Sequence, residues 1–195
     1  FAVLTLNEAI DLREHGFEQD ILLLEGAFEA YEISIAAKMH FNLVVHNLHQ
    51  LQMIEKLKLN RPLDIHFKIN TGMNRLGLQF SELDKCKSFI KKSNVLMTHL
   101  ACADNPDDEL NQIQFSKFDE AWKYTGQSLL RSVVNSAGSI NFPEQSHDWS
   151  RVGIGMYGGL SDMPELKTAM TFRSQIIGFQ DLKLGERIGY GGRIK

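Results

Sequence analysis

Segments typical of β-strands alternate with segments typical of α-helices about six times along this 195-residue chain. The pattern predicts strands at 1–6, 21–24, 41–46, 63–69, 95–101 and 132–134, another short strand around Arg151 within 149–157, and helices at 29–38, 48–59, 82–90 and 109–124. Thr5 and Glu8 have the spacing of a capping box, which predicts one more helix that stops at Gly16. Short connections between such segments indicate parallel strands joined by crossover helices. An open doubly wound sheet and a closed (β/α) barrel both fit this periodicity.

The stretch 63–80 combines a strand with a polar, glycine-bearing loop. Apolar and polar residues alternate over 63–69, as in a half-buried strand. The strand stops at Asn70-Thr71-Gly72, and Arg75 follows shortly before Gly77. Loops that leave the carboxyl ends of parallel strands carry the binding groups of barrels and open α/β sheets.

Four strands end in polar groups that could act on a ligand, and parallel strands would bring these groups to one face. They are Lys68 with Arg75, His99, Asn135 with Ser136, and Arg151 with Gly153. Each also has a structural interpretation: a surface lysine, a loop salt bridge, a hydrogen-bonded core histidine, a helix N-cap and a glycine bulge. The residues alone therefore predict an α/β protein that binds an anionic small molecule at its strand ends.

Composition excludes several other classes. A formal charge of −3 and a pI near 6.2 give no basis for binding nucleic acid or an anionic membrane. Two cysteines, Cys86 and Cys102, are too few for a disulfide framework, and no residues have metal-ligand spacing. No apolar run approaches the ~18 residues of a membrane span. We expect a cytoplasmic protein with reduced thiols and no metal.

The pattern changes after Pro164. Residues 170–181 read as a long strand without a helix partner, and Leu184-Gly185-Glu186 as a turn. A second, β-rich domain is therefore expected from about residue 170. The chain begins inside an apolar strand and ends just after a turn, which suggests a fragment of a longer protein.

Five motifs resemble those of bacterial alanine racemases, and they occur in the family's order. The stretch 68–77 (KINTGMNRLG) is similar to the family signature K-x-[ND]-[TS]-G-M-x-R-L-G. The others are THLA at 98–101, NSA at 135–137, DWSRVGI at 148–154 and GYGGR at 189–193. The resemblance implies a TIM-type (β/α)8 barrel over 1–169, incomplete because its first strand is missing. The first strands of a C-terminal β domain would follow at 170–195.

The resemblance also implies a pyridoxal 5'-phosphate enzyme that interconverts L-alanine and D-alanine, for peptidoglycan or alanine catabolism, as a head-to-tail homodimer. Arg151 would donate to the pyridine nitrogen, with His99 as its partner. Asn135, Ser136, Gly153 and Ile154 would bind the cofactor, chiefly its phosphate. Two further roles follow: Arg75 would lie near the substrate carboxylate, and Lys68 is the position that family members often carboxylate.

Racemisation needs two bases on opposite faces of the substrate Cα. In the family these are a Schiff-base lysine on the first strand and a tyrosine of the partner's β domain, and neither stretch occurs here. The 195 residues alone are therefore expected to be inactive. The alternatives are a non-catalytic pyridoxal-phosphate-binding barrel protein, or a broad-specificity racemase or decarboxylase of the same fold.

Overall fold

Six parallel strands form one curved sheet in the computed structural model, which describes residues 1–90, 94–160 and 163–192. The strands are β1 (Ala2–Val3), β2 (Ile21–Leu23), β3 (Phe41–Val45), β4 (Ile65–Lys68), β5 (Val95–Met97) and β6 (Leu130–Ser132). Within the described residues each strand pairs with its neighbours in sequence, in the order β1-β2-β3-β4-β5-β6. A doubly wound sheet reverses its strand order partway, whereas a barrel adds strands in succession. The order therefore identifies an incomplete (β/α) barrel and excludes the open alternative.

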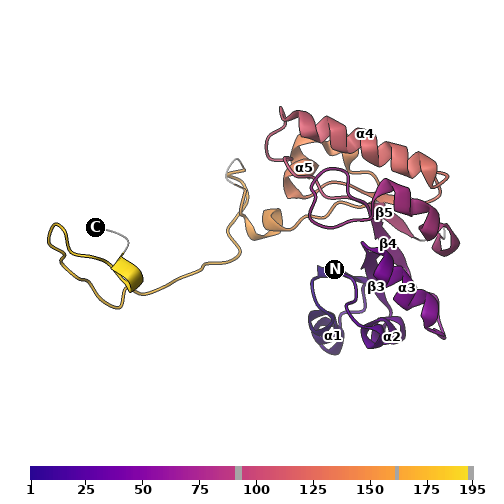
Figure 1. The fold of residues 1–195 in the computed structure, drawn as a ribbon, viewed down its shortest axis with the longest axis horizontal. Helices are drawn as coiled ribbons and strands as arrows, with labels where there is room; N and C mark the ends of the chain where they lie inside the picture. The colour runs from indigo at the N-terminus through magenta and orange to yellow at the C-terminus, as the bar shows by residue number, and fades with distance from the viewer. Residues whose placement is uncertain (91–93, 161–162, 193–195) are drawn as a thin grey trace.

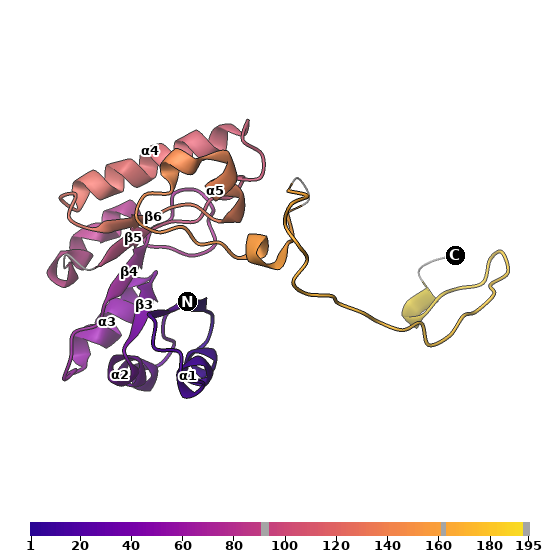
Figure 2. The same cartoon turned by 180° about the vertical axis from the view of Figure 1, so that it is seen from behind.

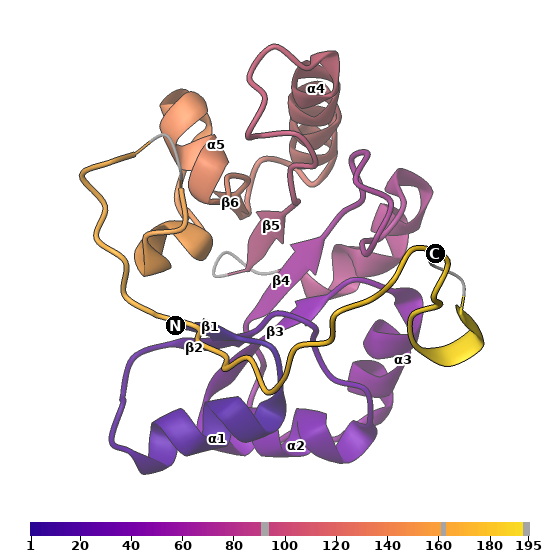
Figure 3. The ribbon, with the colours of Figure 1, turned by 90° about the vertical axis from the view of Figure 1, so that its left-hand side faces the viewer.

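The helices cover the outer, convex side of the sheet (Figure 3). The α-helices are α1 (Leu6–Glu14), α2 (Ala30–Met39), α3 (Leu48–Lys56), α4 (Glu109–Tyr124) and α5 (Ser136–Asn141). The capping box predicted for α1 is confirmed: the Glu8 carboxylate accepts hydrogen bonds from the backbone N–H of Leu4 at 2.9 Å and of Thr5 at 2.8 Å. No helix in the described ranges is long and apolar enough to cross a membrane.

The main hydrophobic core lies between the sheet and these helices. Phe41, Phe67 and Phe118 are its largest fully buried side chains. Leu22, Val44 and Met97 form a second, small cluster of buried residues, separate from the main core. Residues of β4 alternate between the two sides, so the polar face predicted for this strand is the concave face of the half-barrel.

Strand β6 begins two residues before the predicted 132–134, and three segments differ in type from the sequence prediction. Residues 80–89 form a 3₁₀ helix, η1 (Phe80–Phe89), whose buried Leu83 and Cys86 are three residues apart, the repeat that lines up in a 3₁₀ helix. The strand expected around Arg151 is a single bridge to Asn135. It does not continue, because the Gly153 N–H donates to the Ser136 hydroxyl instead of to a neighbouring strand. The chain then forms η3 (Ile154–Tyr157), and a one-turn 3₁₀ segment, η2 (Pro143–Gln145), follows α5.

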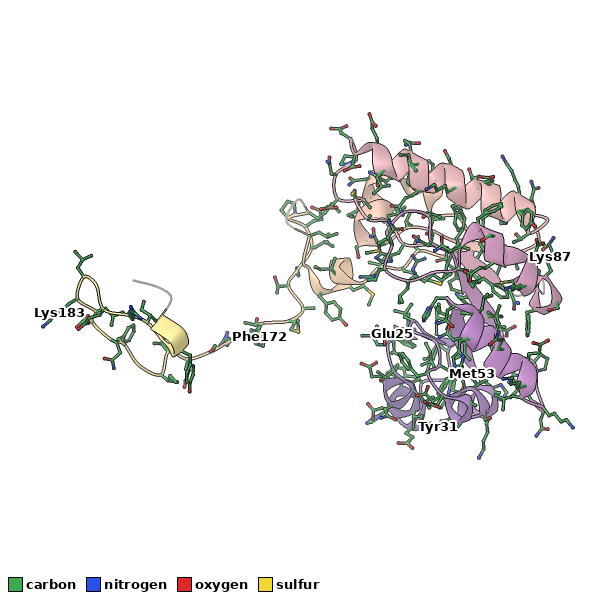
Figure 4. The ribbon with its side chains drawn as sticks, in the orientation of Figure 1. Glu25, Tyr31, Met53, Lys87, Phe172 and Lys183 are labelled. Carbon is green, nitrogen blue, oxygen red and sulfur yellow. The ribbon has the colours of Figure 1, made fainter. Side chains whose placement is uncertain are left out.

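The third difference is the segment expected to be a strand at 170–181. It runs away from the sheet without a strand partner in the described chain (Figures 1 and 2). A strand needs a neighbour for its backbone hydrogen bonds, and Phe172, which lies on this extended stretch, is 93% exposed (Figure 4). The turn predicted at 184–186 is confirmed by the bond from Glu186 N–H to Lys183 C=O at 3.0 Å. Beyond it lies η4 (Tyr190–Gly192), and Arg193 of the last motif falls outside the described residues.

Candidate active site

The loop after β4 folds back on the end of its own strand. Asn70 N–H donates to Leu78 C=O at 2.9 Å, and Leu78 N–H donates to Lys68 C=O at 2.8 Å. Gly77 makes this closure possible: its φ is +135°, and a Cβ there would lie 2.5 Å from the Asn70 nitrogen. The fold-back presents Arg75 to solvent near the tip of the loop.

Lys68 ends β4 with a buried side chain, only 7% exposed, so it is not a surface lysine. Burial, together with the nearby positive charges of Arg151 and Arg75, lowers the pKa of its ammonium from 10.5 to about 8. No carboxylate forms an ion pair with Lys68 among the described residues. The structure thus holds a cation in an unfavourable position.

Arg151 is anchored against the ends of two strands. Its guanidinium donates to Ser132 Oγ at 2.5 Å, to Val133 C=O at 3.2 Å and to Thr98 C=O. Burial lowers the pKa of Arg151 to about 10, so it remains a cation at neutral pH. Three of its five N–H donors have these partners, and the other two have none within the described ranges.

Two histidines near these cations are held neutral. Burial is the main cause that lowers the pKa of His66 and of His99 to about 4, and the charge of Arg151 is the second cause for both. His66 comes from the polar face of β4, and His99 follows β5. A neutral imidazole can accept a hydrogen bond, whereas a protonated one can only donate.

Ser136 joins the start of α5 to the glycine-containing segment after Arg151. Its hydroxyl oxygen accepts hydrogen bonds from Gly153 N–H at 2.9 Å and Gly155 N–H at 3.1 Å. Asn135 is the N-cap of α5, as its structural interpretation predicted, and its side chain accepts from Gly138 N–H at 2.9 Å. The Ser136 hydroxyl keeps its own hydrogen for a third partner.

A cavity of about 760 Å³ opens at the carboxyl ends of β5 and β6. Its lining includes six of the eight site residues predicted from sequence: His99, Asn135, Ser136, Arg151, Gly153 and Ile154. Lys68 and Arg75 do not line it, although their charges reach His99 and lower its pKa. The charged residues among its lining are Arg151 and Asp104, and the Arg151 side of the cavity, near Lys68 and Arg75, suits an anionic small molecule.

Three buried polar residues support this arrangement and were missed from sequence. Gln114 of α4, Thr71 and Thr98 are each no more than 2% exposed and are hydrogen-bonded to one another in series. Gln114 carried a usable signal, because the helical period places it on the buried face of α4 beside Phe115 and Phe118. A buried polar residue on an apolar helix face normally has a hydrogen-bond partner. Here the partners of Gln114 belong to the loops of the site.

Fold and site together define a (β/α) barrel domain whose ligand site, at the carboxyl ends of its strands, carries positive charge. The family model for the N-terminal domain of alanine racemase matches residues 1–161. The chain belongs to the alanine racemase family.

The known proteins that are similar to this chain are longer than it. It is 39% identical over 203 residues to an alanine racemase of Nitrosospira multiformis, an alignment that covers 98% of the chain and 56% of that protein. The solved alanine racemase of Acinetobacter baumannii superposes with a TM-score of 0.79 at 33% identity, covering 100% of this chain and 57% of that one. A Bartonella henselae alanine racemase with covalently bound pyridoxal phosphate gives 0.74 at 25% identity, covering 86% and 52%. The chain thus spans about half the length of these relatives.

Proposed function

We propose that this chain is the cofactor-binding part of a pyridoxal 5'-phosphate-dependent alanine racemase, which interconverts L-alanine and D-alanine. The observation that carries the proposal is the cavity at the strand ends, where Arg151, His99 and Ser136 converge near the positive charges of Lys68 and Arg75. Family membership and the cofactor bound by the Bartonella henselae enzyme support the same conclusion.

The residues present fit this cofactor. Pyridoxal phosphate is an aromatic dianion with one ring nitrogen, and it needs donors at both ends of the ring. Two N–H groups of Arg151 have no partner within the described chain, and the Ser136 hydroxyl can still donate one hydrogen bond. When bound, the cofactor would supply an electron sink that makes the substrate's α-proton acidic.

Each of these side chains would then have one task. Arg151, a cation with a pKa of about 10, would donate a hydrogen bond to the ring nitrogen and disfavour its protonation. Ser136, Asn135 and the segment Gly153–Ile154 would hold the phosphate. His99 would stay neutral beside Arg151, and Arg75 would attract the substrate carboxylate.

The bases that move the α-proton are proposed to lie outside these residues. By resemblance to the family, one is a lysine of a preceding strand and the other a tyrosine of a partner subunit. The active protein is therefore proposed to be a homodimer of a longer chain in the cytoplasm, and the 195 residues alone to be inactive. By resemblance, Lys68 is at the position that family members often carboxylate; carboxylation there would turn a buried cation into an anion that pairs with Arg75, and the Lys68 measurement in the Discussion distinguishes the two states.

Titration with pyridoxal phosphate, combined with a racemisation assay on the longer protein, tests this proposal. We expect saturable binding, conversion of L-alanine to D-alanine, and at least tenfold weaker cofactor binding in Arg151→Leu. Arg131→Leu is the matched control, because Arg131 stacks on Trp122, with 4.2 Å between the guanidinium carbon and the ring centroid. Binding without racemisation would favour the non-catalytic carrier, and no binding would refute the proposal.

A further inference from the structure

Gln114 connects the loop that carries Arg75 with the loop that carries His99. The side chain is 0% exposed, and it projects from α4 toward the carboxyl ends of β4 and β5. Its amide nitrogen donates to Thr71 Oγ1 at 3.0 Å and to His99 C=O at 2.9 Å. Its amide oxygen accepts from Ala101 N–H at 2.8 Å. One side chain thus satisfies backbone and hydroxyl groups of both loops.

The hydroxyl hydrogens give this network a fixed direction. Thr98 Oγ1 donates to Ile69 C=O at 3.1 Å, so the hydrogen between the two threonine hydroxyls, 2.7 Å apart, must come from Thr71. Thr71 can give that hydrogen because Gln114 already donates to its oxygen. The order of donation is therefore Gln114 to Thr71, Thr71 to Thr98, and Thr98 to the carbonyl of Ile69, the residue after β4.

The network reaches the cationic site at three points. Thr71 lies in the loop that bears Arg75, the carbonyl of His99 is held directly, and the carbonyl of Thr98 accepts from Arg151. The loop approaches α4 closely at Gly72, where a Cβ would lie 3.4 Å from Gln114 Cγ. A buried network with every donor paired keeps its members in one arrangement.

We propose that Gln114 is a positioning residue that fixes the spacing between the Arg75 loop and the His99 loop. It thereby sets the affinity of the site for the substrate carboxylate, a role that rests on the proposed racemase function. Gln114 itself does not line the cavity, so it acts through the two loops.

The test compares Gln114→Met with Gln112→Met in the longer, cofactor-loaded protein. Both replacements are on α4, but Gln112 is exposed. Loss of one net hydrogen bond corresponds to about a tenfold change. We expect Gln114→Met to raise the KM for alanine about tenfold with kcat changed less than threefold. Amide hydrogen exchange should accelerate about tenfold in both 70–77 and 99–103. Gln112→Met should change neither quantity.

Two further variants keep the test decisive if Gln114→Met does not fold. Thr71→Val preserves shape and removes only the hydroxyl link, and Gln114→Glu keeps the size but removes both donors. Each should show the same KM and exchange pattern. An unchanged KM in an active protein, or faster exchange in one loop only, would overturn the inference. A wild-type protein that neither binds pyridoxal phosphate nor racemises alanine would instead refute the proposed function, and the exchange data would still decide whether Gln114 couples the loops.

Discussion

Replacing Lys68 with methionine tests whether the site stores unfavourable charge. Lys68 is 7% exposed, and its pKa is lowered from 10.5 to about 8 by burial and by the charges of Arg151 and Arg75. A difference of that size corresponds to about 3 kcal/mol. Partial solvent screening of the ammonium reduces it to about 1–2 kcal/mol. Methionine fills similar space without charge, so Lys68→Met should raise the free energy of unfolding at pH 7 by that amount.

The sign of the pH dependence follows from the same lowered pKa. Folded protein releases the Lys68 proton near pH 8, whereas the unfolded chain holds it to about 10.5. Between these values the unfolded state binds more protons, so the stability of the wild type should rise with pH, and the rise should be absent in Lys68→Met. Urea unfolding followed by circular dichroism at pH 7, 8.5 and 9.5 measures both effects. Lys117→Met, at an exposed position of α4, is the control and should change neither.

A destabilised Lys68→Met with no pH-dependent rise in the wild type would refute this reasoning. It would mean that Lys68 is paired with an anion or carries negative charge itself. Carboxylation of the lysine produces that outcome, so repeating the measurement in bicarbonate-free buffer separates the modified from the unmodified side chain.

Two other predictions concern stability of the same region. His66, whose Nδ1 is buried without a partner in the described chain, has its pKa lowered from 6.5 to about 4. The free energy of unfolding of the wild type should therefore decrease as pH falls from 6.5 to 4. In His66→Leu this decrease should be smaller by about 2–3 kcal/mol, which denaturation midpoints across this pH range measure. Gly77→Ala should destabilise the protein by about 3 kcal/mol, since its Cβ would meet the Asn70 nitrogen at 2.5 Å. Gly16→Ala, also at positive φ but in open space, should cost about 1 kcal/mol, and equal losses in thermal unfolding would contradict the steric argument.

Local chemistry made much of the fold predictable from sequence. The capping box of α1 involves residues three apart, and the helical period of α4 extends over four turns, so both could be identified without tertiary information. The choice between a barrel and an open sheet could not be made from these local patterns, because it depends on which strands pair. The strand prediction for 170–181 was wrong. The composition of this segment is typical of a strand, but a strand forms only where a neighbouring strand supplies backbone hydrogen bonds.

The candidate site shows the same division. Alternation along β4 identified a polar face containing Lys68, but only the curvature of the sheet decides that this face is enclosed. The bond from Arg151 to Thr98 spans 53 residues, and no sequence spacing indicates it. Motif resemblance placed most of the cavity residues, whereas Gln114 belongs to no motif that we singled out.

The succession of strands in the sheet also bears on how the chain is made. Each strand pairs with the strand synthesised just before it, so the scaffold can assemble in order as the chain leaves the ribosome. Pairing between successive strands keeps contact order lower than pairing between strands far apart in the sequence would. Arg151 emerges after all six strands, and its arrival brings the mutually repelling cations together. The electrostatic cost of the binding site therefore arises only after the six strands described here have been synthesised.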